Sequence, residues 1–411
     1  MLTQKLTTAA TWSAIALGFA IPISTAASNL LLALTLLLFV VSGDYREKFS
    51  AIIANPSARA VLLFCALIAL GSTYGLGSAA DKLHYLGKYF SLLLAPLLIP
   101  LFSSRADRLR ALAAFGAAML LTLAMSYAIR YGWLPSGLLA VVDGRDPAMG
   151  GANNPVVFKL HITHGFLMAF GAFLLAIMAR HLPSPRLRWS AIVISMLAAG
   201  NVLLMVQGRT GYAVLAVLAA YLVYGRCGRR GIAIAALAIT LFGAAAYQWS
   251  GAFHERLHAT ITEASTWQEG KGARTSIGMR FDYYTNTLFI IRDHPWFGVG
   301  IGGFENAYDQ RIKDTGMAPA NNPHNQYLLI AAQLGVVGLA ALLWLYAVYW
   351  RQAGRLEPSF REIARGVLLA ILVGNLFNSF MLDFTERMFF AWISGVLLAE
   401  LSERREGAAS G

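Results

Sequence analysis

Long apolar stretches dominate the chain and are separated by short polar segments. A helix needs about 20 mostly apolar residues to span a bilayer, and about twelve stretches approach that length. They lie near residues 10–25, 28–42, 57–77, 86–102, 109–130, 160–180, 189–207, 210–225, 231–250, 323–350, 364–381 and 385–402. The pattern therefore predicts an all-α integral membrane protein with about 12 transmembrane helices.

Two of the polar interruptions are long, near residues 131–159 and 251–322. We therefore expect transmembrane helices in residues 1–250, a large loop in 251–322, and the last helices with a polar tail in 323–411. Long loops in compact proteins are usually functional or disordered. The second one has order of its own, because residues 277–294 show helical periodicity.

One face of that predicted helix is apolar, and Pro295 ends it. The expected stripe consists of Ile277, Phe281, Tyr284, Leu288 and Ile291. The glycine-rich stretch GVGIGGF, residues 298–304, follows. Glycine permits positive φ and close backbone approach, so we expect a tight turn. A dinucleotide-binding loop is disfavoured, because no βαβ unit surrounds these glycines.

Composition agrees with a membrane protein. Apolar residues make up 57% of the chain and charged residues only 13%, whereas soluble domains carry about 25% charged residues. This balance excludes an ordinary soluble enzyme, a disordered chain and a nucleic-acid-binding protein. The net charge of +12 is concentrated in alternate short loops. Their basic clusters are Arg46/Lys48, Arg105/Arg108/Arg110, Arg180/Arg186/Arg188, Arg226/Arg229/Arg230, Arg351/Arg355/Arg361 and Arg404/Arg405.

Basic loops face the cytoplasm in multi-pass membrane proteins. We therefore expect both termini to be cytoplasmic and residues 251–322 to lie on the opposite, periplasmic side. The positive charge is then a topology signal and does not imply a nucleic-acid partner.

The sequence gives no sign of a metal or nucleotide cofactor. It has no GxxxxGK[ST] loop and no pair of acids separated by a single residue. Cys65 and Cys227 are too few for a disulfide scaffold or a zinc site. His161 and His164 could share a helix face, but packing is favoured over metal ligation because no carboxylate lies near them in sequence.

Arginines at the external ends of apolar segments are candidates for anion binding. Arg209, in VQGRTGY, lies where one apolar run ends and the next begins; a snorkelling interfacial arginine is the alternative. Arg280 lies on the predicted external helix with Tyr283, Tyr284 and Thr287 on or beside its face. A solvated surface charge is the alternative there.

His324 is the candidate general base. We expect Asn322 to cap the next helix, with Pro323 and His324 in its first turn. The positive end of the helix dipole would disfavour the imidazolium form there and keep a neutral base. The alternative is a capping or interfacial histidine.

Four further residues are candidates on the same external face. Lys82 and Lys88 could add positive charge or belong to a solvated loop. Asp383 and Glu386 could position an arginine or only pair with Arg387. Cations and a neutral histidine on one face, with no metal motif, suit a lipid-linked diphosphate, which arginines neutralise with bidentate hydrogen bonds.

The central motif resembles the O-antigen ligase/polymerase superfamily, and most of all its lipid A core–O-antigen ligases. It consists of Arg280, RDHPWFGVGIGGFENAY at 292–308 and NNPHNQYLLIAAQLGVVGL at 321–339. In that superfamily an arginine precedes a Pro- and Gly-rich turn, and a His-Asn-x-x-Leu segment opens the next span. QGRTGY resembles the family's other arginine-bearing segment. Gln207 and Gly208 stand where small hydroxylated residues are common in relatives.

The resemblance implies a periplasmic-face glycosyltransferase related to other all-helical membrane glycosyltransferases, working without metal or nucleotide. It implies transfer of a glycan from undecaprenyl diphosphate to a sugar hydroxyl of lipid A–core in the bacterial inner membrane, with inversion at the anomeric carbon. Arg209 and Arg280 would bind the diphosphate, and His324 would activate the acceptor hydroxyl. We expect Lys82 to bind the donor diphosphate as well. Lys88, Tyr284, Asn325, Asp383 and Glu386 would have supporting roles.

Three other functions remain open. An O-antigen polymerase and a protein O-oligosaccharyltransferase would use the same donor and the same arginine and histidine chemistry. A lipid-linked sugar transporter is compatible with about twelve spans, but it predicts charges near the bilayer midplane. Here nearly all charges lie at the ends of the predicted spans.

Overall fold

A computed structural model describes residues 2–135, 151–249, 251–268 and 275–402. Within these ranges all regular structure is helical. The N-terminal part contains α1 (Leu2–Ile23), α2 (Thr25–Val41), α3 (Tyr45–Ala54), α4 (Pro56–Gly71), α5 (Ala79–Phe90), α6 (Leu94–Leu98) and α7 (Arg105–Arg130). The short 3₁₀ turn η1 (Ser91–Leu93) joins α5 to α6, and a second 3₁₀ turn, η2 (Ile99–Leu101), follows α6.

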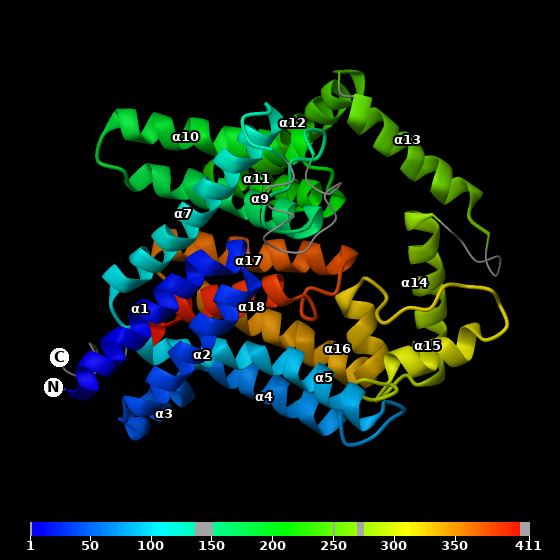
Figure 1. Ribbon diagram of the computed structural model, residues 1–411, viewed down its shortest axis with the longest axis horizontal. Helices are drawn as coiled ribbons and strands as arrows, with labels where there is room; N and C mark the ends of the chain where they lie inside the picture. The colour runs from blue at the N-terminus through cyan, green and yellow to red at the C-terminus, as the bar shows by residue number, and fades with distance from the viewer. Residues whose placement is uncertain (1, 136–150, 250, 269–274, 403–411) are drawn as a thin grey trace.

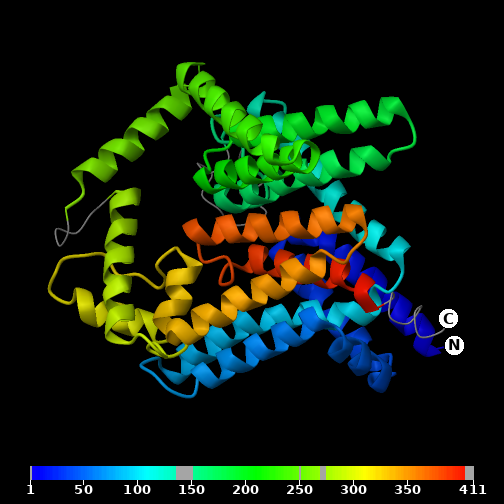
Figure 2. The same ribbon diagram turned by 180° about the vertical axis from the view of Figure 1, so that it is seen from behind.

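The middle and C-terminal parts continue the bundle. The middle contains α9 (His161–Met178), η4 (Ala179–His181), α10 (Pro185–Gly200), the π turn η5 (Asn201–Met205), α11 (Arg209–Cys227) and α12 (Arg229–Trp249). Beyond it come α13 (Gly251–Thr266), α14 (Ser276–Asp293) and α15 (Phe304–Ile312), then α16 (Gln326–Ala353), α17 (Pro358–Phe377) and α18 (Phe384–Leu398). In Figures 1 and 2, α17 and α18 lie between the N-terminal helices and α9–α11.

The interior is centred on α18. Trp392 is fully buried, and its indole Nε1 donates a 2.8 Å hydrogen bond to the carbonyl of Ala14 on α1. Gly18 leaves the space that this ring fills, since a Cβ there would lie 2.1 Å from an indole carbon. Small residues allow membrane helices to approach closely. The C-terminal helix is therefore enclosed by earlier segments of the chain.

Every predicted apolar stretch coincides with a helix, so the all-α multi-pass architecture is confirmed. Seven helices are long and apolar enough to cross a membrane, or up to eight if the bent pair α2–α3 counts as one span. α4 is apolar but only 16 residues long, and α18 has 15. The figure of about twelve spans, and the division at residues 250 and 322, therefore remain predictions.

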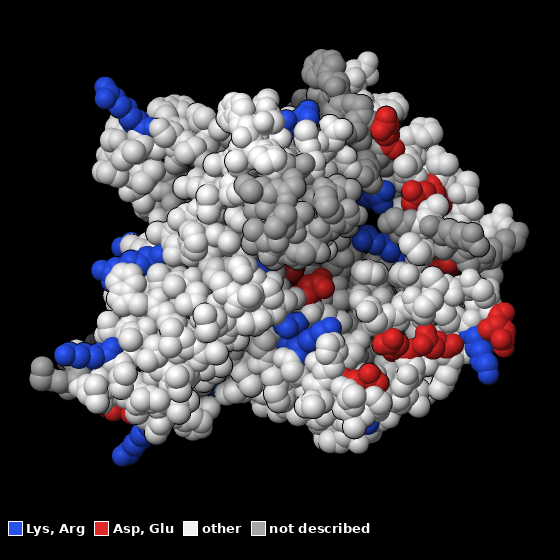
Figure 3. Space-filling view, in the orientation of Figure 1, with Lys and Arg blue, Asp and Glu red and all other residues white. Residues whose placement is uncertain are grey.

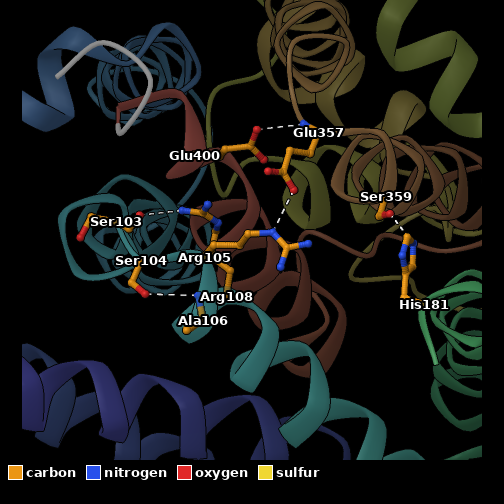
Figure 4. A network of polar contacts seen from close by, with 9 residues as sticks. All are labelled: Ser103, Ser104, Arg105, Ala106, Arg108, His181, Glu357, Ser359 and Glu400. Atoms are coloured by element: carbon orange, nitrogen blue, oxygen red, sulfur yellow. Dashed lines mark hydrogen bonds and ion pairs between the residues drawn. The ribbon is translucent and has the colours of Figure 1, made fainter. Parts of the chain in front are cut away.

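Segments that carry basic clusters meet at one end of the bundle (Figure 4). Arg105 Nε lies 3.1 Å from Glu357 Oε2. Close to Glu357 in the chain, Glu362 on α17 pairs with Arg180. Glu400 accepts a 2.8 Å hydrogen bond from the backbone N–H of Glu357. These contacts join the start of α7, the end of α9, the α16–α17 connection and the chain after α18. The charge pattern predicts one shared side for these segments; its assignment to the cytoplasm remains a prediction, and Arg404 and Arg405 lie outside the described residues.

The opposite end carries α13, α14 and α15 (Figure 1). The predicted helix at 277–294 is present as α14, but its predicted apolar stripe is not its most buried face. Its buried positions are Asp282, Asn286, Thr287 and Ile290, while Leu288 is 55% exposed. Polar groups can be buried when they are hydrogen-bonded. Here Trp267 Nε1 donates a 2.8 Å bond to Asp282, so pairing within residues 251–322 sets the phase of the helix.

The glycine-rich turn is inserted into a break in α16. Gly335, within α16, has φ +65°, and the carbonyls of Ala332 and Gln333 accept 2.9 Å hydrogen bonds from the N–H groups of Val299 and Gly300. The expected positive φ is found at Gly298, Gly300 and Gly302. The turn satisfies backbone groups that the broken helix leaves free, as buried amides require. It thereby fixes the chain on which α14 and α15 are mounted.

Candidate functional site

Arg209 is the first residue of α11, and two glycines bring that helix start against α9. A Cβ at Gly208 would lie 2.8 Å from the carbonyl oxygen of His161, and one at Gly211 would lie 2.9 Å from the Cα of Gly165. No larger residue fits either position without movement of the backbone. The GRTG sequence therefore places Arg209 close to the start of α9.

Arg280, on the second turn of α14, lies within electrostatic reach of Arg209. Burial lowers the pKa of the Arg280 guanidinium, Tyr284 opposes that change, and the positive charge of Arg209 lowers the pKa further. The two cations come from segments 71 positions apart in the sequence. Two neighbouring guanidinium groups repel one another, so a bound anion would relieve the repulsion.

His324 is held in an unusual backbone conformation beside these arginines. Its φ is +52°, in the left-handed region, and its N–H donates a 2.8 Å bond to Asn322 Oδ1. Its ring lies 5.9 Å from that of Tyr283. Burial lowers the pKa of His324, Arg280 lowers it further, and a hydrogen bond to Asn378 raises it. Backbone strain of this kind is concentrated at functional sites.

Asn378 joins the imidazole to the start of α11. Its Nδ2 donates a 3.1 Å hydrogen bond to the hydroxyl of Thr210, and its side chain is also hydrogen-bonded to the His324 imidazole, which raises the pKa of His324. A base held through one ring nitrogen presents the other nitrogen to a substrate. The geometry is thus suited to proton acceptance.

The predicted start of the helix after His324 is wrong by a few residues. The helix begins at Gln326, and Asn325 is its N-cap, with Oδ1 accepting from the N–H groups of Tyr327 and Leu328. The left-handed turn at His324 changes the direction of the chain before the helix begins. Asn322 Oδ1 therefore accepts from the N–H of His324 and is not the N-cap of the helix. The expected lowering of the His324 pKa is present, but its causes are burial and Arg280, not a place in the first turn.

Tyr284 and Asn325 attach the site to the end of α17. The Tyr284 hydroxyl donates to the carbonyl of Leu376 at 3.2 Å, and Asn325 Nδ2 donates to the same carbonyl at 3.1 Å. These bonds hold α14 and the start of α16 against one point. Both side chains thereby fix the position of the chain that carries His324.

Lys88, Asp383 and Glu386 belong to a second group of charges. Burial raises the pKa of the Asp383 carboxyl, while Lys88 and Arg387 oppose that change. Glu386 is 1% exposed and is hydrogen-bonded to Thr163 at the start of α9. Asp383 therefore interacts electrostatically with both Lys88 and Arg387.

Lys82 lies at the glycine-rich turn. A Cβ at Gly302 would meet the backbone of Asp81 and Lys82 at 2.9 Å. The structure thus brings Arg209, Arg280 and His324 together, whereas Lys82 packs at the turn that supports α16.

The contacts of His164 lie inside the bundle. His164 is 2% exposed, and its Nε2 is 3.0 Å from Asn201 Oδ1. Within the described ranges no group of three or more His, Cys, Asp or Glu side chains is placed to hold a metal ion. Hydrogen bonding inside the bundle is the role that the contacts show for His164.

Several site residues were not identified from the sequence. Thr210 and Asn378 stand beside or between apolar runs, and Lys159 is a lone charge just before one. A polar residue at the end of a span was the available signal, but many such positions only face the membrane surface. In Figure 3, Lys and Arg side chains and Asp and Glu side chains lie close together around a hollow to the right of the centre of this face.

Comparison with known proteins indicates a family for part of the chain. Residues 194–343 match the family model described as O-antigen ligase. The matched range contains Arg209, Arg280 and His324. The match supports placement in the O-antigen ligase superfamily.

A Haemophilus influenzae protein described as uncharacterized is 32% identical over 116 residues. This alignment covers 27% of the present chain and only 29% of the relative. It therefore adds a local similarity and says nothing about the activity of the whole protein.

Proposed function

We propose that this protein is a periplasmic-face O-antigen ligase. It transfers a glycan from undecaprenyl diphosphate to a sugar hydroxyl of lipid A–core in the bacterial inner membrane. The observation that carries the proposal is the convergence of Arg209, Arg280 and a hydrogen-bonded His324 from three separate segments. The match to the O-antigen ligase family model over residues 194–343 supports it.

The donor diphosphate is assigned to the two arginines. Arg209 stands at the start of α11, where Gly208 provides no side-chain cap. Backbone N–H groups at a helix start attract anions, and planar guanidinium groups match phosphate oxygens. As the bond from the anomeric carbon to the phosphate oxygen breaks, negative charge grows on the leaving diphosphate. Preorganised cations stabilise such charge most strongly in the transition state.

The acceptor hydroxyl is assigned to His324. A neutral imidazole takes the hydroxyl proton while the oxygen attacks the anomeric carbon, and Asn378 holds the ring in place. The lowered pKa of His324 keeps the base neutral near pH 7. No step is assigned to a metal, so we expect transfer to persist in EDTA.

Ion pairs at the end of the bundle opposite α13, α14 and α15 disfavour a transport function. A transporter must open there, but Arg105 at the start of α7 pairs with Glu357 on the α16–α17 connection (Figure 4). Arg180, in η4 after α9, pairs with Glu362 on α17. Surface ion pairs are individually weak. Together with buried Glu400, however, they join four segments of the chain.

The test is an acceptor comparison with purified protein in proteoliposomes. Lipid-linked glycan is supplied with rough lipopolysaccharide, with a second lipid-linked glycan, or with a pilin. Glycosylated lipopolysaccharide is the expected product. Elongated lipid-linked glycan would instead indicate a polymerase, and glycosylated pilin a protein oligosaccharyltransferase. Movement of the donor across the bilayer without any new glycosidic bond would overturn the enzymatic proposal.

A further inference from the structure

A polar cavity lies beside the start of α9, apart from the arginines. Its volume is about 370 Å³, within the range of about 300–1,000 Å³ common for small-molecule sites. Four segments supply its walls: the start of α2, the chain before α9, the start of α9 and the start of α18. Its polar lining residues are Thr25, Lys159, Thr163, Asp383, Thr385 and Glu386.

Glu386 marks this cavity as a binding site. Its side chain is 1% exposed, and its Oε1 has no hydrogen-bond partner among the described residues. A buried acceptor without a donor costs about 1–3 kcal/mol. Most buried polar atoms in proteins have a partner, so an unpaired oxygen on a residue that lines a cavity is a candidate acceptor for a ligand donor.

The other lining groups restrict the chemistry of that ligand. Lys159 Nζ donates a 3.0 Å bond to the Thr25 hydroxyl, so donors and acceptors alternate around the wall. A phosphate group would face the carboxylates of Asp383 and Glu386 and be repelled. A lipid tail would leave these polar groups unsatisfied. A ring with several hydroxyl groups can donate to the carboxylates and accept from the lysine.

The cavity also adjoins the proposed reaction centre. Leu160 and Thr163 line it, and the carbonyl of His161 between them packs against Gly208, next to Arg209. On the other side, the α17–α18 connection contacts the imidazole through Asn378 and reaches the cavity at Asp383. Two elements are thus shared by the cavity and the centre.

We propose that this cavity, the Glu386 cavity, binds a saccharide ring of one of the two substrates. Glu386 and Asp383 accept hydrogen bonds from ring hydroxyls, and the Lys159 and Thr163 side chains complete the polar wall. The naming of the substrates rests on the proposed glycosyl transfer. Binding of the saccharide by the cavity does not require turnover and can be measured without it.

The experiment measures equilibrium binding of two soluble glycans to the full-length protein in detergent. One is the delipidated core oligosaccharide and the other is O-antigen glycan released from its carrier. Glu386→Gln and Thr163→Val are compared with Glu305→Gln, an exposed acid on α15. Losing a hydrogen bond to a charged group costs about 1.5–3 kcal/mol. The affinity of the cavity variants for one of the two glycans should therefore fall about tenfold or more. The control should bind as the parent does.

The glycan whose affinity falls shows whether the cavity binds the acceptor or the donor. Thermal unfolding of each variant separates loss of a contact from loss of the fold, and two chemically different cavity variants guard against either one misfolding. Parental affinity for both glycans in both folded variants would overturn the proposal. So would failure of either glycan to bind the parent.

The two proposals can fail independently. Suppose that glycan binding depends on Glu386 but the protein transfers glycan to no acceptor. The proposed saccharide site would then stand, and the proposed enzymatic activity would be rejected. Transfer to lipopolysaccharide with unchanged KM for both substrates in Glu386→Gln would keep the enzyme and reject the cavity.

Discussion

The backbone N–H of Gly300 donates a 2.9 Å hydrogen bond to the carbonyl oxygen of Gln333, inside the break of α16. This bond joins a turn between α14 and α15 to the helix that follows His324. The arginine on α14 and the histidine before α16 are therefore mounted on one backbone-bonded unit. Their relative positions depend on glycines that lie outside the site.

We expect substitution of Gly335 to destabilise the protein. Gly335 has φ +65°, and a Cβ there would lie 2.2 Å from the backbone of Trp296. The conformational strain alone costs about 1–3 kcal/mol. Gly335→Ala should lower the midpoint of thermal unfolding in detergent. Gly116→Ala on α7, with nothing within 4 Å of the added Cβ, is the matched control and should be neutral or stabilising.

Replacing either arginine by lysine should impair transfer while keeping the charge. Arg209→Lys and Arg280→Lys lose the planar fork that binds phosphate oxygens bidentately. Loss of one charge-assisted hydrogen bond costs about 1.5–3 kcal/mol, which corresponds to roughly 10–100-fold in kcat/KM. Kinetics in proteoliposomes measure the effect. Arg292→Lys, an exposed arginine on the same helix as Arg280, should show parental kinetics.

The His324→Ala variant should lack the general base but still bind the donor. Removal of a general base typically slows a reaction about 10²–10⁴-fold. Equilibrium binding of lipid-linked glycan should persist in this variant and be weak in Arg209→Ala and Arg280→Ala. Transfer at the parental rate would show that His324 is not the base. Loss of donor binding would place the imidazole in the diphosphate site.

The rate should fall at acid pH through protonation of His324. Burial and Arg280 lower its pKa below the ordinary 6.5, so the neutral, active form persists down to a lower pH than usual. The acid limb of kcat/KM, which reports the free enzyme, should therefore have its midpoint below pH 6.5. Arg280→Gln removes one cause of the lowering and should move the limb to higher pH.

Asn378→Asp should shift that limb in the same direction. A carboxylate in place of the amide that hydrogen-bonds the imidazole would favour its charged form and raise its pKa. An acid limb that stays in place in both Asn378→Asp and Arg280→Gln would mean that another group controls it.

Membrane topology can be tested with single cysteines. The native thiols are Cys65, which is buried, and Cys227, which is exposed and is first replaced by serine. An impermeant reagent applied from the periplasmic side should label Ser265→Cys on α13 and spare Arg229→Cys at the start of α12. Labelling of the second and protection of the first would reverse the proposed orientation.

The sequence alone determined where the helices form and which basic segments share one end of the bundle. Apolar run length decides where membrane helices form, so every predicted stretch coincides with a helix. The HNQYLL and GRTGY segments likewise indicated the histidine and arginine, because lone polar residues at span ends are recognisable locally. The positive φ of the 298–304 turn was predictable from glycine content for the same reason.

Tertiary structure decided which residues meet and which faces are buried. Arg209 and Arg280 are neighbours only because Gly208 and Gly211 press α11 against α9 and because the broken α16 anchors α14. The buried face of α14 is polar, since Trp267 supplies the donor that Asp282 needs. Asn378 and Glu386 acquire partners from helices far away in the sequence. Periodicity records the average polarity around one helix, whereas pairing between distant groups exists only after the helices have packed.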